Sequence, residues 1–325
     1  MLQDNHGRQS TYLRLAVTDR CNLRCRYCMP AEGIDFAPRS ELLTFEEITK
    51  LCEVLAELGV NKVRLTGGEP LSRRGLPDLV DKLAGIFPTL AITTNGVLLP
   101  QHFDRLHAAG LHRYNLSLDT LRPDRFFAIT RRDDFSGTWR ALELLEAASL
   151  PVKINVVVMR GVNDDELLDF VALTEARRID VRFIEAMPFN DDDGNHDVYL
   201  SATQILTIIQ NAYPSATRDD DAFGSSAVGY QIPGHQGRFS IIPAYSRSLC
   251  GSCNRLRLTP KGTMLNCLYS TKGLELRPLL RSGASRQDLA DLITAFVRGK
   301  HATGHVTQAL EQTGSTFASM TSIGG

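Results

Sequence analysis

Three cysteines stand within eight residues near the beginning of the chain, in the run CNLRCRYC. Cys21, Cys25 and Cys28 have the spacing C-x3-C-x2-C and follow a predicted strand. Three thiolates can hold three corners of an Fe4S4 cluster, and the fourth iron then keeps an open position at which a small molecule can bind. A zinc site that takes its fourth ligand from elsewhere is the alternative. The spacing and the preceding strand favour the cluster.

A second set of three cysteines lies much later in the chain. Cys250 and Cys253 form a C-x2-C pair, and Cys267 follows fourteen residues after it. The residues between them alternate like a strand, and a turn then leads to a returning strand, predicted at 264–269, that carries Cys267. A hairpin of this kind would bring Cys267 back to the pair. The spacing favours a second cluster over zinc, for which His235 is the nearest candidate as a fourth ligand.

The charge balance excludes a basic field over the whole chain. There are 36 Lys and Arg against 37 Asp and Glu, and the net charge is −1. Nucleic acid is therefore not expected as a partner, and an anionic substrate would need a local cluster of cations. Arg255 and Arg257 share one face of the strand predicted inside the second cysteine set. Two guanidinium groups beside an open iron would suit an anion, although a solvated strand face is the more ordinary interpretation of this pattern alone.

Composition and cysteine usage indicate an intracellular globular protein. The chain of 325 residues is 43% hydrophobic, which is enough for a core without disulfide bonds. Six of its seven cysteines fall into the two sets of three, and Cys52 is left over in a predicted helix, where we expect a buried, inert thiol. No apolar run approaches a membrane span, and the polar start does not resemble a signal peptide. We expect a cytoplasmic protein without a membrane partner.

Strand patterns alternate with helical patterns through the first part of the chain, which predicts a parallel α/β sheet. The predicted strands are 12–17, 60–66, 90–94, 113–118, 152–159 and 181–185. A doubly wound sheet or a barrel fits this alternation. Cysteines occupy the first turn, where a dinucleotide-binding fold needs its glycines, so we expect an incomplete (βα)6 TIM-type barrel. Its chemistry should gather at the C-terminal strand ends, where 67–70, Thr93, Ser117 and Met187 lie.

The pattern changes after residue 188, so we expect a barrel over 1–188 and a C-terminal extension over 189–325. The extension contains a predicted hairpin at 228–232 and 238–242 and a helix over 287–298 that Ser285 opens. The acidic run at 190–195 lacks the ligand spacing of a calcium loop, which favours a solvated loop. The tail from Gly299 onward is polar and weakly patterned.

The motifs resemble those of a known superfamily. CNLRCRYC followed by TGGEP at 66–70 is similar to the radical S-adenosylmethionine superfamily. The stretch CGSCNRLRLTPKGTMLNC at 250–267 and the terminal Gly-Gly narrow the resemblance to the GTP 3′,8-cyclase (MoaA) family of molybdenum cofactor biosynthesis. The resemblance continues through KVRLTGGEPL, TTNG, NLSLD, VKINVVV and VRFIEAMP, and so covers nearly the whole chain. A C-x3-C-x2-C motif alone would identify only the superfamily.

The resemblance implies two 4Fe–4S clusters. Cys21, Cys25 and Cys28 would hold the first, whose open iron binds S-adenosylmethionine and whose reduction cleaves it to methionine and a 5′-deoxyadenosyl radical. The second cysteine set, Cys250, Cys253 and Cys267, would hold a cluster whose open iron faces the guanine of GTP.

The resemblance also implies which residues contact the small molecules. For S-adenosylmethionine these are Tyr27, Gly68, Glu69, Ser117 and Met187. For GTP they are Arg14, Arg64, Thr93, Lys153, Arg255 and Arg257. Five of the latter six are cationic, as a triphosphate requires. Gly324 and Gly325 would reach into the active site and support the radical chemistry.

Each of these residues has a milder interpretation without the resemblance. The cations in predicted strands, Arg14, Arg64 and Lys153, could be paired charges at a barrel rim. Glu69 could be a surface carboxylate next to an ordinary glycine turn. In the same way, Thr93 and Ser117 could cap strands, Met187 could be a core residue, and the terminal glycines could be a frayed end.

The reaction that the resemblance implies converts GTP to (8S)-3′,8-cyclo-7,8-dihydroguanosine 5′-triphosphate. The radical takes the 3′ hydrogen of the ribose, and C3′ then adds to C8 of guanine. The implied partners are a flavodoxin- or ferredoxin-like reductant, a downstream cyclic pyranopterin monophosphate synthase and a second copy of the chain in a homodimer. The enzymatic alternative is a radical peptide- or protein-modifying enzyme, which usually carries more C-terminal cysteines than the three found here. The non-catalytic alternative is a zinc- or iron-binding regulatory module.

Overall fold

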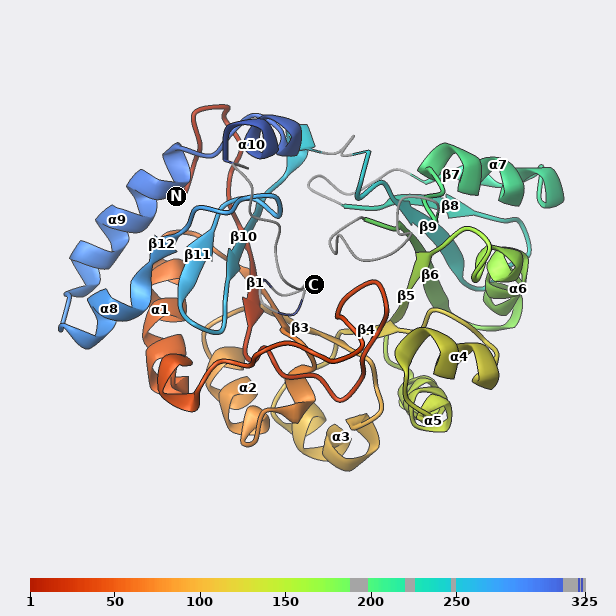
Figure 1. The fold of residues 1–325 in the computed structure, drawn as a ribbon, viewed down its shortest axis with the longest axis horizontal. Coiled ribbons are helices and arrows are strands. Elements are labelled where there is room, and N and C mark those ends of the chain that lie inside the picture. Colours follow the sequence, from red (N-terminus) through yellow and green to blue (C-terminus); the bar gives the residue numbers. More distant parts are fainter. Residues whose placement is uncertain (188–197, 220–225, 247–249, 312–320, 322, 324–325) are drawn as a thin grey trace.

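A strongly curved sheet forms the frame of the molecule in the computed structural model, and helices cover its outer side (Figure 1). The structure describes residues 1–187, 198–219, 226–246, 250–311, 321 and 323. Twelve strands within these residues form one sheet, in the order β12-β11-β10-β1-β2-β3-β4-β5-β6-β9-β8-β7. No described helix combines the length and the apolar run that crossing a membrane requires.

Six parallel strands make the central part of this sheet, and each pairs with the next one along the chain. They are β1 (Tyr12–Ala16), β2 (Lys62–Thr66), β3 (Thr89–Thr94), β4 (Tyr114–Ser117), β5 (Val152–Val158) and β6 (Ile179–Glu185). The outer edges of β1 and β6 pair with strands from later in the chain, so these six strands do not close on themselves. The expected incomplete barrel of six βα units is therefore confirmed.

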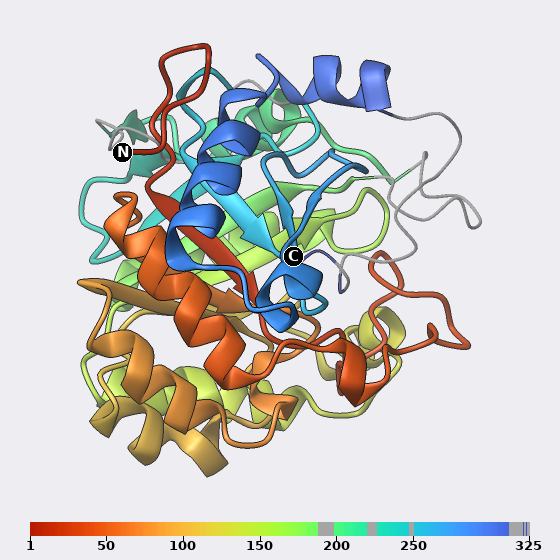
Figure 2. The ribbon, with the colours of Figure 1, turned by 90° about the vertical axis from the view of Figure 1, so that its left-hand side faces the viewer.

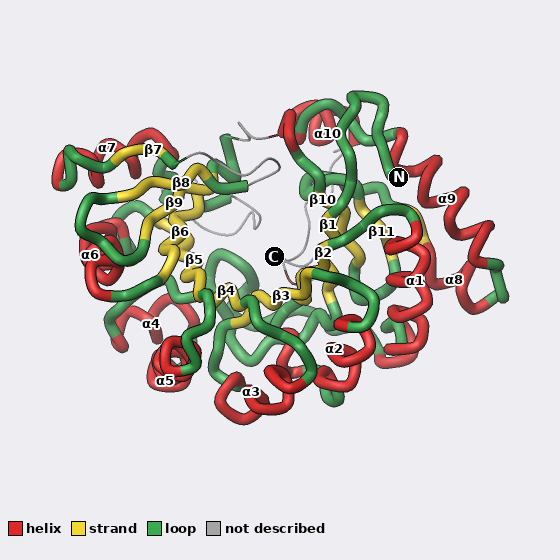
Figure 3. Tube along the Cα trace, turned by 180° about the vertical axis from the view of Figure 1, so that it is seen from behind, coloured by secondary structure: helices red, strands yellow, loops and turns green. Residues whose placement is uncertain are grey.

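Helices follow the central strands and pack outside them, where Figure 3 shows them around the arc of strands. They are α1 (Phe45–Glu57), α2 (Leu76–Ala84), α3 (Leu99–Ala108), α4 (Pro123–Thr130), α5 (Phe135–Ala147) and α6 (Leu167–Ala176). Helix α1 begins at a reciprocal capping box between Thr44 and Glu47. Its apolar face is buried against the sheet and includes Cys52, which is completely buried as expected.

The chain after β6 adds strands to both edges of the sheet. On the β6 side, β9 (Arg238–Ile242) pairs in parallel with β6 and antiparallel with β8 (Val228–Gln231), and β7 (Thr217–Arg218) pairs with β8. On the β1 side, β10 (Arg255–Leu258) pairs in parallel with β1, and β11 (Thr263–Leu265) and β12 (Leu274–Glu275) follow antiparallel. Both predicted hairpins are present. Cys267, however, lies after β11 and not within it, which corrects the predicted strand.

The remaining helices are α7 (Ala202–Ala212), α8 (Leu276–Arg281), α9 (Arg286–Arg298) and α10 (Gly304–Glu311). Single turns of 3-10 helix occur at Arg39–Glu41, Pro70–Ser72, Asp164–Glu166 and Cys250–Ser252. Helix α9 begins at Ser285, as predicted, and packs beside α1 (Figure 2). Helix α10 lies in the weakly patterned tail and was not expected. The proposed domain boundary at residue 188 and the acidic run at 190–195 lie outside the described residues, so the division into 1–188 and 189–325 stays a prediction.

Candidate active site

A cavity of about 640 Å³ lies on the inner side of the curved sheet. All six cysteines of the two sets line it, together with residues from each of the six central strands. The predicted S-adenosylmethionine contacts and GTP contacts also line it, namely Tyr27, Gly68, Glu69, Ser117, Met187, Arg14, Arg64, Thr93, Lys153, Arg255 and Arg257. The fold thus brings these predicted residues into one chamber, while their individual roles stay predictions.

The first cysteine loop follows β1 at its C-terminal end and is fixed to the end of α4. The Arg24 and Arg26 amides donate to the carbonyls of Thr130 and Ile129. The Arg131 guanidinium donates in return to the Arg24 and Met29 carbonyls, at 3.0 Å each. Backbone contacts on both sides of Cys25 therefore set the conformation of the loop that presents the three thiols.

Gly67 and Gly68 allow β2 to approach this loop closely. The Gly68 amide donates to the carbonyl of Thr18, and the Glu69 amide donates to that of Arg20. A Cβ atom on Gly67 would lie 2.2 Å from the Thr18 carbonyl oxygen, and Gly67 also has a φ of 144°. The pair is therefore not an ordinary turn but the place where two backbones meet behind the cysteine loop.

Glu69 is buried, with 1% of its surface exposed, so the interpretation as a surface carboxylate is wrong. Its carboxylate accepts from the Leu71 amide, the Thr94 hydroxyl and the Asn95 amide at 2.7–2.9 Å. Burial raises the pKa of Glu69 to about 7, against the effect of these three hydrogen bonds. The side chain therefore ties the end of β2 to the end of β3 on the cavity wall.

Asp119 is a cavity residue that the sequence analysis did not single out, although it belongs to the motif NLSLD. It accepts from the Tyr27 hydroxyl and from the Val157 amide, both at 2.8 Å. Burial raises the pKa of Asp119 to about 6 and that of Tyr27 well above its usual value. This contact fixes the tyrosine of the cysteine loop against the ends of β4 and β5. Ser117 and Met187 line the same end, and the Tyr269 hydroxyl contacts the Met187 sulfur at 3.2 Å.

Strand register concentrates cations on the inner face of β1 and its two neighbours. Arg64, Arg14 and Arg257 form one row across β2, β1 and β10, and Lys62, Tyr12 and Arg255 form the adjacent row. Arg64 and Arg257 are 6% and 8% exposed. Burial and the neighbouring arginines lower the pKa of Arg14 to about 10 and that of Arg257 to about 9. The interpretation of Arg255 and Arg257 as a solvated strand face is therefore wrong.

The Tyr12 hydroxyl lies among these cations. It accepts a 2.5 Å hydrogen bond from Nε of Arg64, whose Nη1 lies 3.4 Å from the Thr93 hydroxyl. Although burial alone would raise the pKa of Tyr12, Arg64, Arg14 and Lys62 outweigh it and lower the value to about 7. Tyr12 and Lys62 were both missed from the sequence, although each stands two residues before a predicted contact, Arg14 or Arg64, and so on the same face of its strand.

A second group of cations lies on β5, β6 and β9 around one carboxylate. Asp180 is 2.7 Å from Arg182, 3.4 Å from Arg238 and 3.9 Å from Lys153. Burial, followed by the charge of Arg182, lowers the pKa of Lys153 to about 8. Asp219 also pairs with Arg238, at 3.1 Å, so two carboxylates face these three cations. All three cations line the cavity, and the group retains a positive excess. Arg182 and Arg238 were not predicted from the sequence.

The second cysteine set lies at the opposite end of β1 from the first. Tyr12, at the start of β1, is in register with Arg255, so Cys253 stands beside the beginning of β1, whereas the first set follows the strand's end. Burial alone would raise the pKa of Cys253, but Arg255 and Lys300 lower it to about 6. In the first set, burial and Glu69 raise the pKa of Cys21 to about 12. The two ends of the cavity therefore have opposite electrostatic character.

The donor chemistry of both ends fits iron–sulfur clusters. All seven cysteines are free thiols. His235 lies against the outer helices instead, with Nδ1 2.8 Å from the Thr174 hydroxyl and its ring against Tyr213, so it does not complete the second set. Within the described residues, no group of three or more His, Cys, Asp or Glu side chains has the arrangement that would hold a single metal ion. Sets of three thiols facing an open cavity are the donor type that 4Fe–4S clusters take.

The cavity also offers hydrogen-bond acceptors to a ligand. Oδ1 of Asn155 and Oδ1 of Asn254 are buried and have no hydrogen-bond partner among the described residues, and both asparagines line the cavity.

The C-terminal tail also reaches the cavity. Thr321 lines it, and Arg257 Nη1 lies 3.4 Å from the carbonyl of Ile323. Gly324 and Gly325 lie outside the described residues, and their predicted role is not tested.

Comparisons with known proteins agree with this geometry. The family model "Radical SAM superfamily" matches residues 15–174, and the model "Molybdenum Cofactor Synthesis C" matches residues 179–306. The chain is 41% identical to the GTP 3′,8-cyclase of Moorella thermoacetica over the whole of both chains. It is 42% identical to the GTP 3′,8-cyclase of Desulforamulus reducens, over 93% of this chain and 95% of that protein.

Longer relatives and a solved structure extend the comparison. The chain is 45% identical to molybdenum cofactor biosynthesis protein 1 of Mus musculus over 92% of its own length, and it spans 48% of that protein. The chain thus spans about half the length of the curated relatives of this name. The crystal structure of Streptococcus suis SuiB matches with a TM-score of 0.63 at 13% identity, over 93% of this chain and 73% of that one. At this identity the likeness concerns the fold alone.

The close approach at Gly67 generates a prediction about stability. Gly67→Ala adds a methyl group that meets the Thr18 carbonyl and also strains a backbone with positive φ. Gly161→Ala is the matched control, because Gly161 has a φ of 68° with nothing within 4 Å of the added Cβ atom. We expect Gly161→Ala to cost about 1–2 kcal/mol of unfolding free energy. Gly67→Ala should cost about 2 kcal/mol more, measured by denaturant titration. Equal losses in the two variants would contradict the close approach.

Proposed function

The chain belongs to the GTP 3′,8-cyclase family of the radical S-adenosylmethionine superfamily, and we propose that it converts GTP to (8S)-3′,8-cyclo-7,8-dihydroguanosine 5′-triphosphate. This is the first step of molybdenum cofactor biosynthesis. One observation carries the proposal, namely a single cavity with a set of free thiols at each end and rows of cations on its wall.

The first set of cysteines would hold the cluster that works with S-adenosylmethionine. Bound by Cys21, Cys25 and Cys28, a 4Fe–4S cluster supplies the electron that cleaves S-adenosylmethionine to methionine and a 5′-deoxyadenosyl radical. The residues around it would orient the molecule, and they are Tyr27, Gly68, Glu69, Ser117 and Met187. Glu69 and Asp119 hold the strand ends and the tyrosine in place, so the pocket is formed before the ligand arrives.

The cations would bind the triphosphate of GTP. The predicted contacts Arg14, Arg64, Thr93 and Lys153 lie next to Lys62, Arg182 and Arg238, which we add to the proposed phosphate-binding group. Guanidinium and ammonium groups are the common partners of phosphate oxygens. Because Asp180 and Asp219 are two carboxylates against three of these cations, a polyanion would relieve the repulsion that remains.

The second set of cysteines, with Arg255 and Arg257, would receive the guanine. Cys250, Cys253 and Cys267 would hold the second 4Fe–4S cluster, and the unpartnered oxygens of Asn155 and Asn254 could accept from the N–H groups of the base. The ribose would then lie between the two ends, where the buried wall excludes water and holds C3′ for loss of its hydrogen. No general acid or base is required for this step.

The proposal extends to partners and place of action. A flavodoxin- or ferredoxin-like protein would supply the electrons, and a cyclic pyranopterin monophosphate synthase would take the product. We further propose that the enzyme acts in the cytoplasm, as a homodimer, with the barrel over 1–188 and the extension over 189–325. The peptide-modifying alternative has less support, because the relatives that match over their full length carry the cyclase name and the likeness to SuiB concerns the fold alone.

The proposed reaction is tested directly with anaerobically reconstituted protein. With S-adenosylmethionine and dithionite, GTP should raise the rate of 5′-deoxyadenosine formation severalfold, and the cyclised nucleotide should accumulate in step with it. ATP is the control, because it offers the same triphosphate without guanine. Mass spectrometry of the nucleotides measures both products. If 5′-deoxyadenosine forms only at the rate seen without nucleotide, the proposed function is wrong.

The two cysteine sets should be separable by mutation. In Cys267→Ser, iron content should fall by about half and GTP cyclisation should stop, while basal cleavage of S-adenosylmethionine continues. Cys52→Ala is the control, because this buried thiol lies outside both sets, and its iron content and cyclisation should match the parent. Iron analysis and 5′-deoxyadenosine assays measure the two effects. Loss of cyclisation and basal cleavage together would count against separate roles.

Lys153 should make GTP binding depend on pH. Burial lowers the pKa of Lys153 to about 8, and a bound triphosphate would favour its charged ammonium form. At a pH above about 8, Lys153 should therefore take up a proton when GTP binds. Affinity should then fall as pH rises through about 8, by up to about tenfold per pH unit. Calorimetry in buffers of different ionisation enthalpy measures the uptake. Lys153→Arg stays charged and should remove the part of this dependence that is centred near pH 8, whereas Lys261→Arg at an exposed position should not change it.

A further inference from the structure

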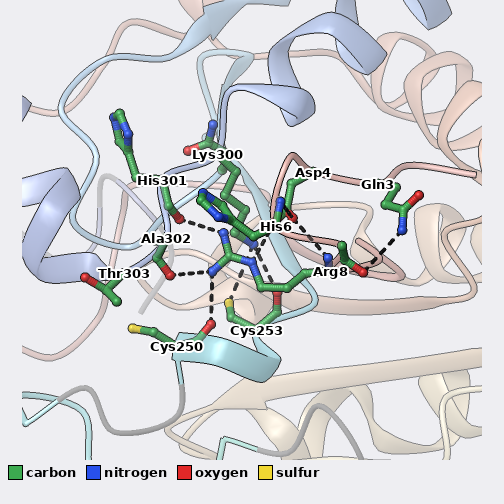
Figure 4. Close-up of polar contacts among 12 residues, drawn as sticks. Gln3, Asp4, His6, Arg8, Cys250, Cys253, Lys300, His301, Ala302 and Thr303 are labelled. Carbon is green, nitrogen blue, oxygen red and sulfur yellow. Dashed lines mark hydrogen bonds and ion pairs between the residues drawn. The ribbon is translucent and has the colours of Figure 1, made fainter.

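Two buried cations, Arg8 and Lys300, lie beside Cys250 and Cys253 of the second cysteine set (Figure 4). Arg8 belongs to the N-terminal segment, and Lys300 follows helix α9. Both are among the buried charged residues. Both contact the C-x2-C pair, and neither belongs to a motif that the sequence analysis identified.

Arg8 joins the N-terminal segment, the second cysteine set and the segment after α9. Its Nε donates to Asp4 at 2.6 Å, in an ion pair that is itself buried. Its Nη1 donates to the carbonyl of Cys250 at 3.0 Å and to that of Ala302 at 2.7 Å, and Nη2 donates to that of His301 at 2.6 Å. Asp4 therefore neutralises Arg8, whose contribution is to hold the Cys250 backbone in place.

Lys300 makes different contacts. It is 3% exposed, and its Nζ donates to the carbonyls of Cys253 and Arg255 at 3.2 and 3.0 Å. The third contact is to the sulfur of Cys253, at 3.6 Å. No carboxylate in the described part of the chain forms an ion pair with Lys300. A buried ammonium without an anionic partner is costly, and a Cys253 sulfur that ligates iron as a thiolate would supply the negative charge.

The sulfur of Cys250 also receives a donor from this segment. The Gly304 amide, at the start of α10, lies 3.4 Å from Cys250 Sγ. The first set also has donors at a sulfur, since Cys21 Sγ lies 3.4 Å from the Leu23 amide and 3.9 Å from the Asn95 side-chain amide nitrogen. The charges around the first set differ, because the buried carboxyls Glu69 and Asp119 act on Cys21 and Cys25, and the Arg24 cation has a smaller effect on Cys21. A cation thus reaches a sulfur of the second set, and carboxylates influence the first.

Hydrogen bonds and positive charge at the ligating sulfurs stabilise the reduced, more negative state of an iron–sulfur cluster and raise its reduction potential. We infer that Lys300 is a positioning residue for the second cluster. Its hydrogen bond to the Cys253 carbonyl holds the backbone of this ligand, and its charge beside the Cys253 sulfur raises the reduction potential of the cluster. This inference rests on the proposed second cluster. It adds that the two clusters differ in potential because of their surroundings, although each has the same three-cysteine ligand set.

The test uses full-length protein in which Cys21, Cys25 and Cys28 are replaced by alanine, so that only the second cluster remains. After anaerobic reconstitution, an electrochemical titration followed by electron paramagnetic resonance of the reduced cluster gives its midpoint potential. Lys300→Met removes the charge and the hydrogen bonds at similar length, and we expect a more negative midpoint. Lys300→Arg keeps the charge, and its midpoint potential should be close to that of the parent. Lys261→Met, at an exposed lysine, should leave the midpoint unchanged.

The outcomes separate this inference from the proposed function. If the parent with intact Lys300 assembles no cluster, the proposed second cluster fails. If it assembles one and Lys300→Met has the same midpoint potential, the inference about Lys300 is wrong and the proposed function stands. If Lys300→Met does not retain iron, Lys300→Gln, which keeps a donor toward the carbonyls, is titrated instead, and an unchanged midpoint overturns the inference in the same way.

Discussion

The parallel pairing of β10 with β1 is the interaction on which the site depends. It joins a strand from the last third of the chain to the first strand, in a register that sets Arg255 beside Tyr12 and Arg257 beside Arg14. The same pairing places Cys253 at the start of β1, while Cys21, Cys25 and Cys28 follow its end. One strand therefore separates the two thiol sets, and the wall between them is cationic. Without this pairing the central strands would carry only one half of the cavity.

The cationic rows are unfavourable for the fold by itself. Like charges directly opposite one another on neighbouring strands destabilise a sheet, and here three arginines occupy one row. Burial adds to the cost, as the lowered pKa values of Arg14 and Arg257 indicate. The Tyr12 hydroxyl offsets part of the repulsion, since the cations draw its pKa down to about 7. A core selected for stability alone would not collect these charges, and a polyanionic ligand gives them a reason to be there.

The sequence predicted those parts of the structure that local signals determine. Capping residues located the starts of α1 and α9, and alternation located the six central strands to within about two residues, whereas the strand predicted at 264–269 ends at Leu265. The cysteine spacing identified both thiol sets. What it could not provide was strand register, because a slip of one residue exchanges the two faces of a strand. Arg182 and Arg238 were missed for this reason, and for the same reason a solvated strand face was the more ordinary interpretation of Arg255 and Arg257. Lys62 was missed although it shares a strand face with the predicted contact Arg64. The interpretation of Glu69 as a surface carboxylate was wrong because its partners, Thr94 and Asn95, come from another strand end.

The near-zero net charge illustrates the same limit. A chain with charge −1 gives no global sign of a phosphate site, yet its inner face is strongly basic. Compensating carboxylates lie elsewhere, for example in the outer pairs of Arg286 with Glu53 and Glu57. Beside the cavity, Asp180 and Asp219 stand against three cations. In the N-terminal segment, Asp4 neutralises Arg8. Positive charge is thus left in excess at the places where anions would bind, and neutralised where Arg8 has a structural role. Local imbalance, which only the fold reveals, is therefore a better guide to the site than the total charge.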